Sequence, residues 1–528
     1  MMRYICFGAL MTTLLVAIAA DGQENWPRFR GANATGVALD DPQLADTWDT
    51  QNNVKWVADV PGWGWSSPVV WGDRVFVTTG YSDAEEKTPS EAEWGAKIKP
   101  ASSGGKPAEG KKPVDKSSGE KGAKSKTAKS KASGATKQGG GGWKPESNYH
   151  WMVYCFDANT GDVIWSREAH TGQAIGRTLR RVSNSYASST PTTDGERVYA
   201  LFGEFGLYCY DFDGNELWTY PLQARKTLID YGYATSPIAY DGSVIFTHDD
   251  EEDSFIASID GKTGKENWKV ARDEPTSYGT PVIWENGLRT EIFSPAQKRI
   301  RSYGLDGSLL WEMDAGMTMN CIPSPFISNN TAFASSGYYK FTHRPVYAFK
   351  PGATGDITLR TWDDGSGPGK NAPRSMTVNE ADAAKAGIDA TADRLADQIS
   401  EKERTGEFIQ WYLPIGGTEI TSPIAYGDYY YALLDTGFLV CYDAKTGKMV
   451  YDRQRLRGRF MTSPWAYNGM LFCQNEKGKT YVIKAGPDFD VLHENHLDET
   501  CIATPAIAQG KLFIRTETKL YCITKDGK

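Results

Sequence analysis

The chain has 528 residues, a net charge of −8 at pH 7, 54 glycines and 12% aromatic residues. This composition is typical of a globular protein and excludes a disordered or fibrous chain. The mild net acidity argues against a specific nucleic-acid binder. Many glycines and aromatics with few long apolar stretches favour short strands joined by tight turns over a helical bundle.

The N-terminus has the pattern of a secretory signal. Arg3 precedes an apolar run over residues 4–20, which ends in small residues. We therefore expect residues 1–20 to be a signal peptide, with the mature protein in the periplasm or outside the cell. The nearby Cys6 lies before the apolar core, so no lipid anchor is expected. No later stretch approaches the roughly 18 apolar residues of a membrane helix, so we expect a chain that does not span the membrane.

A Ser/Thr-Pro pair followed by an apolar strand and a turn recurs eight times between residues 63 and 528. The prolines are Pro68, Pro191, Pro237, Pro281, Pro325, Pro423, Pro464 and Pro505. Five of the seven spacings are 41 to 46 residues, the length of a four-stranded propeller blade, and the other two equal one blade plus an insertion. Since proline cannot donate to a strand ladder, we place it at the start of the innermost strand. The hydroxyl residue before each proline is expected to cap backbone groups.

The repeats have a second marker, whose aromatic only blade 7 lacks: a turn containing Asp and Gly, followed four residues after the Gly by an aromatic side chain. The predicted structural wedges between blades are Trp56, Trp165, Trp218, Trp268, Trp311 and Trp411. The last repeat supplies only three strands. We therefore predict that residues 53–60, within an N-terminal lead over residues 21–62, complete the eighth blade and close the ring.

These repeats resemble the quinoprotein-like (PQQ-like repeat) eight-bladed propellers, whose AxDxxTGxxxW-type signature is matched by residues 157–165 and 443–451. The two ends of the mature chain look like those of a secreted bacterial branch of that family. A more distant resemblance is to the BamB-like propellers of outer-membrane assembly, although this chain lacks a lipidation cysteine and carries two insertions. The predicted fold class is all-β: eight four-stranded antiparallel blades, the last closed by an N-terminal strand, with one disordered and one helical insertion.

The first insertion, residues 82–148, is rich in Lys, Gly and Ser. Residues 97–144 hold thirteen lysines, three acids and no arginine, a charge of +10 that leaves −18 on the rest of the chain. So few apolar residues predict a disordered loop on the face that carries the connections between blades. The second insertion, residues 363–407, has a capping box and apolar residues at helical spacing, which predict an amphipathic helix. We place it between the third and fourth strands of blade 5, with Trp411 rather than Trp362 as the blade aromatic.

The segments before the prolines should line the mouth of the channel, where a ligand would bind. The candidate ligand-binding residues are Arg181, Asn184, Tyr233, Tyr278, Asn320, Glu419 and Arg459. Mixed charge with aromatics would suit a sugar, a peptide or another small polar ligand. The alternative is that these groups pair with one another and with backbone at the blade junctions.

The resemblance implies two functions. One is a non-catalytic scaffold, expected to be a monomer, that binds a protein or polysaccharide of the cell envelope. The other is a dehydrogenase that oxidises alcohols or sugars with pyrroloquinoline quinone (PQQ) and calcium on the propeller axis. Such enzymes generally carry adjacent cysteines near the quinone, and this chain has none, so we favour the scaffold. The sequence predicts no metal site, no catalytic nucleophile and mostly buried free thiols, with Cys473 and Cys501 left as a possible pair.

Overall fold

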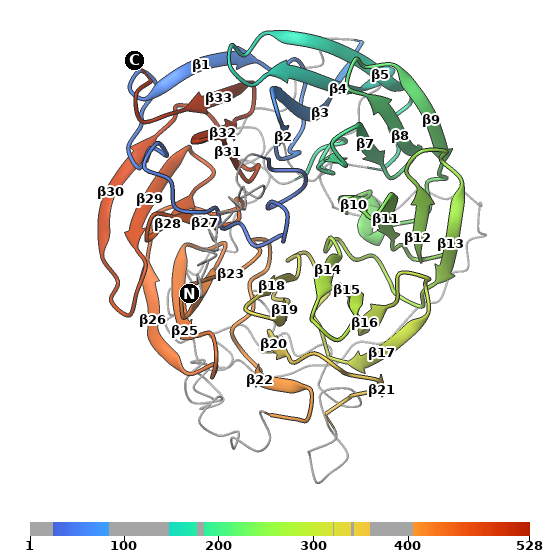
Figure 1. The fold of residues 1–528 in the computed structure, drawn as a ribbon, viewed down its shortest axis with the longest axis vertical. Coiled ribbons are helices and arrows are strands. Elements are labelled where there is room, and N and C mark those ends of the chain that lie inside the picture. The colour runs from blue at the N-terminus through green and yellow to red at the C-terminus, as the bar shows by residue number, and fades with distance from the viewer. Residues whose placement is uncertain are drawn as a thin grey trace, which may run out of the picture.

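The computed structural model describes residues 25–83, 147–176, 184–319, 321–338, 343–359 and 405–527. Within these ranges the strands form eight sheets, each built on an antiparallel four-stranded blade, arranged around a ring (Figure 1). The predicted all-β, eight-bladed propeller is therefore confirmed. The signal peptide, nearly all of the first insertion and most of the second lie outside the described residues. No helix among the described residues is long and apolar enough to cross a membrane.

Each blade is a meander whose strands run from the centre of the ring outwards. Blade 1 contains β2 (Val69–Trp71), β3 (Arg74–Ser82), β4 (Tyr149–Asp157) and β5 (Val163–Gly172). Blade 2 contains β6 (Thr192–Thr193), β7 (Arg197–Phe202), β8 (Gly206–Asp211) and β9 (Glu216–Pro221). Blade 3 contains β10 (Ile238–Tyr240), β11 (Ser243–His248), β12 (Phe255–Asp260) and β13 (Glu266–Ala271), after the short 3₁₀ turn η1 (Leu228–Asp230). Blade 4 contains β14 (Val282–Glu285), β15 (Thr290–Pro295), β16 (Arg299–Tyr303) and β17 (Leu309–Asp314).

The second half of the ring follows the same plan. Blade 5 contains β18 (Phe326–Ser328), β19 (Thr331–Ser335), β20 (Val346–Phe349) and β22 (Ile409–Leu413). Blade 6 contains β23 (Ile424–Tyr426), β24 (Tyr429–Leu433), β25 (Phe438–Asp443) and β26 (Met449–Arg455). Blade 7 contains β27 (Trp465–Tyr467), β28 (Met470–Gln474), β29 (Lys479–Lys484) and β30 (Val491–His496). Blade 8 contains β31 (Ala506–Ala508), β32 (Lys511–Arg515), β33 (Lys519–Ile523) and, as its outermost strand, β1 (Val54–Asp59).

The ring closes as predicted, because β1 pairs antiparallel with β33. One blade departs from the four-strand expectation. The short strand β21 (Gly355–Asp356) leaves blade 5 and pairs in parallel with β17, so the sheet of blade 4 has five strands. The second insertion leaves the chain between β20 and β22, and Trp411 lies on β22 opposite Ala348, as expected for the aromatic of blade 5.

All eight prolines stand immediately before the innermost strand of their blade. The hydroxyl residues that precede them link neighbouring blades through hydrogen bonds around the channel. In seven successive links, the backbone N–H of one blade donates to the hydroxyl of the next at 2.9 to 3.2 Å; the residues are Ser67, Thr190, Ser236, Thr280, Ser324, Ser422, Ser463 and Thr504. The innermost strands thus satisfy buried donors across the blade junctions.

The blade tryptophans lie over the turn glycine of the following blade. A Cβ atom built on Gly264 would come within 2.6 Å of the Trp218 ring, and the same close approach occurs at Gly161 over Trp56. The Trp218 indole also donates a hydrogen bond to the carbonyl of Gly261, at 3.0 Å. Glycine is therefore needed at this turn both for its positive φ and for the absence of a side chain.

Of the remaining predicted wedge tryptophans, all but one also lie over the turn glycine of the next blade. Those that do are Trp165, Trp268 and Trp411. Trp311 instead donates to Glu291 of its own blade, at 2.8 Å, and packs against Phe349. The regular turn is replaced in blade 5 by the segment that carries β21.

We call the side of the ring that bears the connections between blades the connection face, and the opposite side the hairpin face. The N-terminal lead enters the channel from the hairpin face. The Pro27 carbonyl accepts a hydrogen bond from the Thr193 N–H of blade 2, and Arg30 reaches Pro423 at the start of the opposite blade 6, so the lead crosses the centre of the ring (Figure 1). Arg30 is fully buried there, where it donates to the Pro423 carbonyl at 2.6 Å. A ligand that enters the channel would therefore approach from the connection face.

All seven cysteines of the described residues are buried free thiols, including Cys473 and Cys501. Four of them lie opposite blade aromatics in the strand ladders: Cys155 faces Trp165, for example. A small side chain at that position makes room for the large ring, which gives these cysteines a packing role.

Candidate functional site

Six side chains gather on the connection face over blades 2 to 4, and we call them the mouth cluster. Its members are Glu204, Tyr231, Tyr233, His248, Asp250 and Tyr278. Glu204 comes from the β7–β8 loop, and His248 and Asp250 come from the end of β11 and the loop after it. The tyrosines lie in the two connections that precede β10 and β14. In an antiparallel meander all of these segments end at the same face, which brings them together.

His248 is the centre of the cluster. Its ring stacks on Tyr233, with centroids 4.0 Å apart, and its Nε2 donates to the carbonyl of Gly203 at 2.8 Å. Its Nδ1 lies 3.4 Å from Asp250 Oδ2, which also accepts a hydrogen bond from the Tyr233 hydroxyl at 3.1 Å. The ring is thus held between the backbone of blade 2 and a carboxylate of blade 3.

Asp250 is stabilised as a carboxylate. Burial raises its pKa, but hydrogen bonds from His248 and from the backbone N–H groups of Asp253 and Glu252 lower it by more, so that the net value is about 2. This carboxylate is therefore ionised over the whole physiological range, and its acceptor capacity is used within the fold.

Glu204 is in the opposite situation. It is only 7% exposed, and among the described residues the one donor from another residue is the Tyr233 N–H, at 3.4 Å. Burial raises the pKa of its carboxyl to about 7, against the weaker opposing effects of two backbone N–H groups and His248. This carboxyl can therefore change its charge near neutral pH.

Tyr278 also has unused hydrogen-bonding capacity. Its hydroxyl is enclosed and has no hydrogen-bond partner within the described part of the chain. Burial raises the pKa of this phenol, and the nearby Tyr231, Glu204 and Glu251 raise it further. Two groups with unsatisfied capacity thus lie close together, at a place in the fold where buried polar groups are normally paired.

The loop beside the cluster is strained. Ile229 and Asp230 have φ values of 53° and 61°, in the left-handed region that a β-branched residue rarely enters, and Ile229 is 62% exposed. Hydrogen bonds hold the loop in this shape: Gly232 N–H donates to Thr227 Oγ1 at 2.9 Å, and Asn184 Nδ2 donates to the Tyr231 carbonyl at 2.6 Å. Such strain is commonly kept at binding sites.

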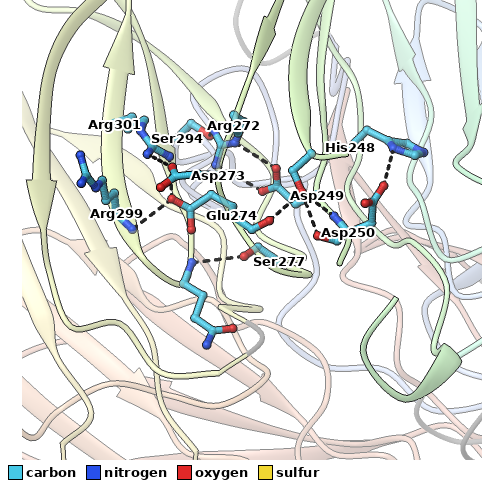
Figure 2. A network of polar contacts seen from close by, with 12 residues as sticks. His248, Asp249, Asp250, Arg272, Asp273, Glu274, Ser277, Ser294, Arg299 and Arg301 are labelled. Atoms are coloured by element: carbon cyan, nitrogen blue, oxygen red, sulfur yellow. Dashed lines mark hydrogen bonds and ion pairs between the residues drawn. The ribbon is translucent and has the colours of Figure 1, made fainter. Parts of the chain in front are cut away.

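A network of ion pairs joins blades 3 and 4 next to the cluster (Figure 2). Arg272 contacts Asp249 at 2.9 Å and donates to Ser294 at 2.9 Å, while Arg301 contacts Glu274 at 2.6 Å. Burial raises the pKa of Asp249 to about 6, although Arg272 opposes this shift. The network anchors the connection that positions Tyr278.

The structure distributes the predicted ligand-binding residues unevenly. Tyr233 and Tyr278 belong to the mouth cluster, and Asn184 supports it from blade 2. Glu419 and Arg459 lie in the connections before β23 and β27, on the other side of the ring. Arg181 and Asn320 lie outside the described residues.

Sequence reasoning missed Glu204, His248 and Asp250. Each follows or ends a second strand rather than preceding a proline, so the proline anchors do not point to it. The run His-Asp-Asp-Glu-Glu-Asp at residues 248–253 was the available signal, because consecutive acids directly after a buried strand are unusual.

The described residues of the mouth cluster do not fit PQQ with calcium. Within the described ranges, no group of three or more His, Cys, Asp or Glu side chains could hold a metal ion. Asp250 has already filled its acceptor positions, and the neighbouring Arg272 and Arg301 are paired with acids, so neither guanidinium is left for a quinone carboxylate. We derive no catalytic step through this cofactor.

Solved structures with similar folds include both enzymes and an assembly protein. The quinohemoprotein alcohol dehydrogenase from Comamonas testosteroni superposes with a TM-score of 0.55 at 10% identity, over 96% of this chain and 82% of that chain. A europium-containing methanol dehydrogenase gives 0.54 at 10% identity, over 95% and 98%. BamB from Moraxella catarrhalis gives 0.43 at 11% identity, over 70% and 88%. Likeness at these identities shows the fold alone.

Comparison with curated protein sequences finds no significant match. A family model matches residues 151–374 and 398–528, about two thirds of the chain. The description of that family is outer membrane protein assembly factor BamB. The chain therefore belongs to this PQQ-like repeat propeller family, whose description names the assembly factor BamB.

Proposed function

We propose that this protein is a non-catalytic binding propeller of the cell envelope, which captures a protein or polysaccharide partner on its connection face. The observation that carries this proposal is the mouth cluster. Glu204 and Tyr278 keep hydrogen-bonding capacity that no described residue uses, whereas His248 Nε2 and the Asp250 carboxylate make hydrogen bonds within the fold. Such a site offers recognition groups rather than a reacting group.

Three further points support the proposal. The family description names an assembly factor rather than an enzyme. The N-terminal sequence is typical of an exported protein. The lead crosses the hairpin side of the channel and leaves the connection face as the approach for a partner.

The dehydrogenase alternative is tested first. Purified full-length protein is mixed with PQQ and calcium, and its absorbance spectrum and dye-linked oxidation of alcohols and sugars are measured. We expect neither a spectral shift nor dye reduction. Saturable oxidation of an alcohol or sugar would overturn the proposed function.

Partner binding is tested on the same preparation. Titration calorimetry with cell-wall oligosaccharides and with unstructured peptides is expected to identify a class that binds the wild type and binds Tyr278→Phe several-fold more weakly. The matched control is Tyr199→Phe, since the Tyr199 hydroxyl bonds to Asp194 at 2.6 Å far from the mouth. Equal weakening by both variants would show that the mouth cluster is not the binding site.

A further inference from the structure

The mouth cluster is acidic and rich in acceptors. Directly after His248 the β11–β12 loop carries five consecutive acids, residues 249–253. Asp249 and Asp250 are buried and paired, Glu251 accepts hydrogen bonds from the backbone and hydroxyl of Thr276 at 3.1 and 2.8 Å, and the last two acids are exposed. Among the described residues of this loop and the 225–233 connection, Arg225 approaches an acid of the loop, and only loosely, at 3.9 Å from Asp253.

The unused hydrogen-bonding capacity of Glu204 and Tyr278 indicates which ligand chemistry fits the cluster. The Glu204 side chain is more than nine-tenths buried, and the long contact of its carboxyl with the Tyr233 N–H leaves acceptor positions open. The Tyr278 oxygen has no partner among the described residues. An ammonium group supplies three donors and no acceptor, whereas a neutral sugar would bring acceptors that this site has few donors to meet. Tyrosine rings add a favourable electrostatic surface for a cation.

The surroundings favour a cation on a side chain rather than a free ion. No described set of ligands here could hold a metal. Ile229 stands 62% exposed on the strained loop beside the cluster, where it can cover the apolar stem of a long side chain. We propose that the mouth cluster binds the ammonium group of a lysine side chain that a partner polypeptide presents. This inference rests on the proposed binding function and narrows its partner to one chemistry.

The proposal predicts how affinity depends on pH. The titratable groups that face Glu204 are Tyr233 from the connection before β10, His248 from β11 and Tyr278 from the connection before β14, and Tyr231 lies beside Tyr278. A lysine ammonium binds the carboxylate form of Glu204 better than the acid form. Affinity is therefore expected to rise between about pH 6 and pH 8.

The experiment uses the full-length protein and a fluorescein-labelled Gly/Ser peptide with two lysines, at about physiological salt, with fluorescence anisotropy at about pH 6 and about pH 8. Acetylation of the peptide lysines is expected to weaken binding at the higher pH by about tenfold, since it removes the charge and two of three donors. Glu204→Gln is expected to cause a similar loss and to abolish the rise with pH. Its control is Glu196→Gln on the hairpin face of the same blade, where the side chain is 75% exposed; that variant should bind as the wild type.

Three outcomes would overturn the inference. The acetylated peptide could bind as tightly as the free one, Glu204→Gln could leave the affinity unchanged, or cadaverine could compete as strongly as the peptide, which would assign the site to a small amine. In each case an oligosaccharide or peptide that still binds the mouth would leave the proposed function standing. Dye-linked oxidation with PQQ would instead remove the proposed function itself.

Discussion

At the scale of single residues, burial and the number of hydrogen-bond donors together decide the pKa of a carboxyl group. Asp250 and Glu204 both lie near the His248 imidazole, yet the pKa of Asp250 is lowered to about 2 and that of Glu204 is raised to about 7. The difference is the number of donors: Asp250 accepts from the Tyr233 hydroxyl and two backbone N–H groups and lies 3.4 Å from His248 Nδ1, while Glu204 has one long contact from another residue. Only at Asp250 do hydrogen bonds to the charged form lower the pKa by more than desolvation raises it.

Glu204→Gln should change the pH dependence of stability. Since the folded-state pKa is above the ordinary 4.5, the folded protein holds a proton that the unfolded chain releases, and stability falls as pH rises from about 4.5 to about 7. The loss amounts to about 3 kcal/mol above pH 7, at about 1.36 kcal/mol per pKa unit. Thermal midpoints measured from about pH 4 to about pH 8 should therefore fall less in Glu204→Gln than in the wild type. The exposed Glu196→Gln serves as the control, and parallel curves for wild type and Glu204→Gln would contradict the account.

At the scale of the element, the blade turn is built around its neighbour. The turn glycine has a positive φ in blade after blade, and in most of them it also carries the indole of the preceding blade directly above it. The Gly and the Trp of one sequence marker therefore belong to two different blade junctions. In blades 1 to 3 the Gly receives one tryptophan, and the Trp four residues later covers the glycine of the next blade.

Two glycines of blade 3 separate the effect of backbone conformation from that of packing. Gly264 and Gly242 have φ values of 71° and 72°, but a Cβ on Gly264 would meet the Trp218 ring, whereas a Cβ on Gly242 would meet nothing within 4 Å. Gly242→Ala should cost about 1–2 kcal/mol for the left-handed backbone. Gly264→Ala should cost at least about 1–3 kcal/mol more through overpacking against Trp218. Equal losses in thermal midpoint would show that the indole moves aside without cost.

At the scale of the whole molecule, the two ends of the first insertion are joined by the fold itself. Asp83 N–H donates to the carbonyl of Asn148 at 2.9 Å, and the hydroxyls of Ser82 and Ser147 lie 2.6 Å apart, so β3 and β4 remain paired up to the point where the insertion begins. The ring should therefore not depend on residues 97–144 for closure.

Deletion of residues 97–144 is expected to leave the thermal midpoint within about 1–2 °C of the wild type, because β3 and β4 are already joined without this segment. It should weaken binding to anionic surfaces at low salt, independently of the mouth cluster, and the difference should shrink as salt is added, because thirteen lysines are lost with three acids. A deletion that removes β1 should instead destabilise the ring strongly, since β1 covers the edge of β33. A large fall in midpoint for the first deletion would show that this segment supports the fold.

Much of the architecture could be predicted from the sequence. The eight prolines predicted eight innermost strands, and residues 53–60 predicted the closing strand, because proline placement and strand periodicity act within a few residues of chain. The fifth strand of blade 4 was missed, since β21 has only two residues and no alternating pattern. For the site, the anchor segments led to Tyr233 and Tyr278, but not to Glu204, whose surrounding residues give no local signal.

The sequence by itself determined the repeat, its closure and the face on which the connections lie, because each depends on local hydrogen-bonding limits of proline, glycine and strand residues. The tertiary structure alone decided which connections meet. It brought a loop of blade 2, the end of β11 and two tyrosine-bearing connections around one imidazole, and left Glu419 and Arg459 elsewhere on the ring. It also decided the charge of each carboxyl, since burial and donor count depend on neighbours that are far apart in the chain.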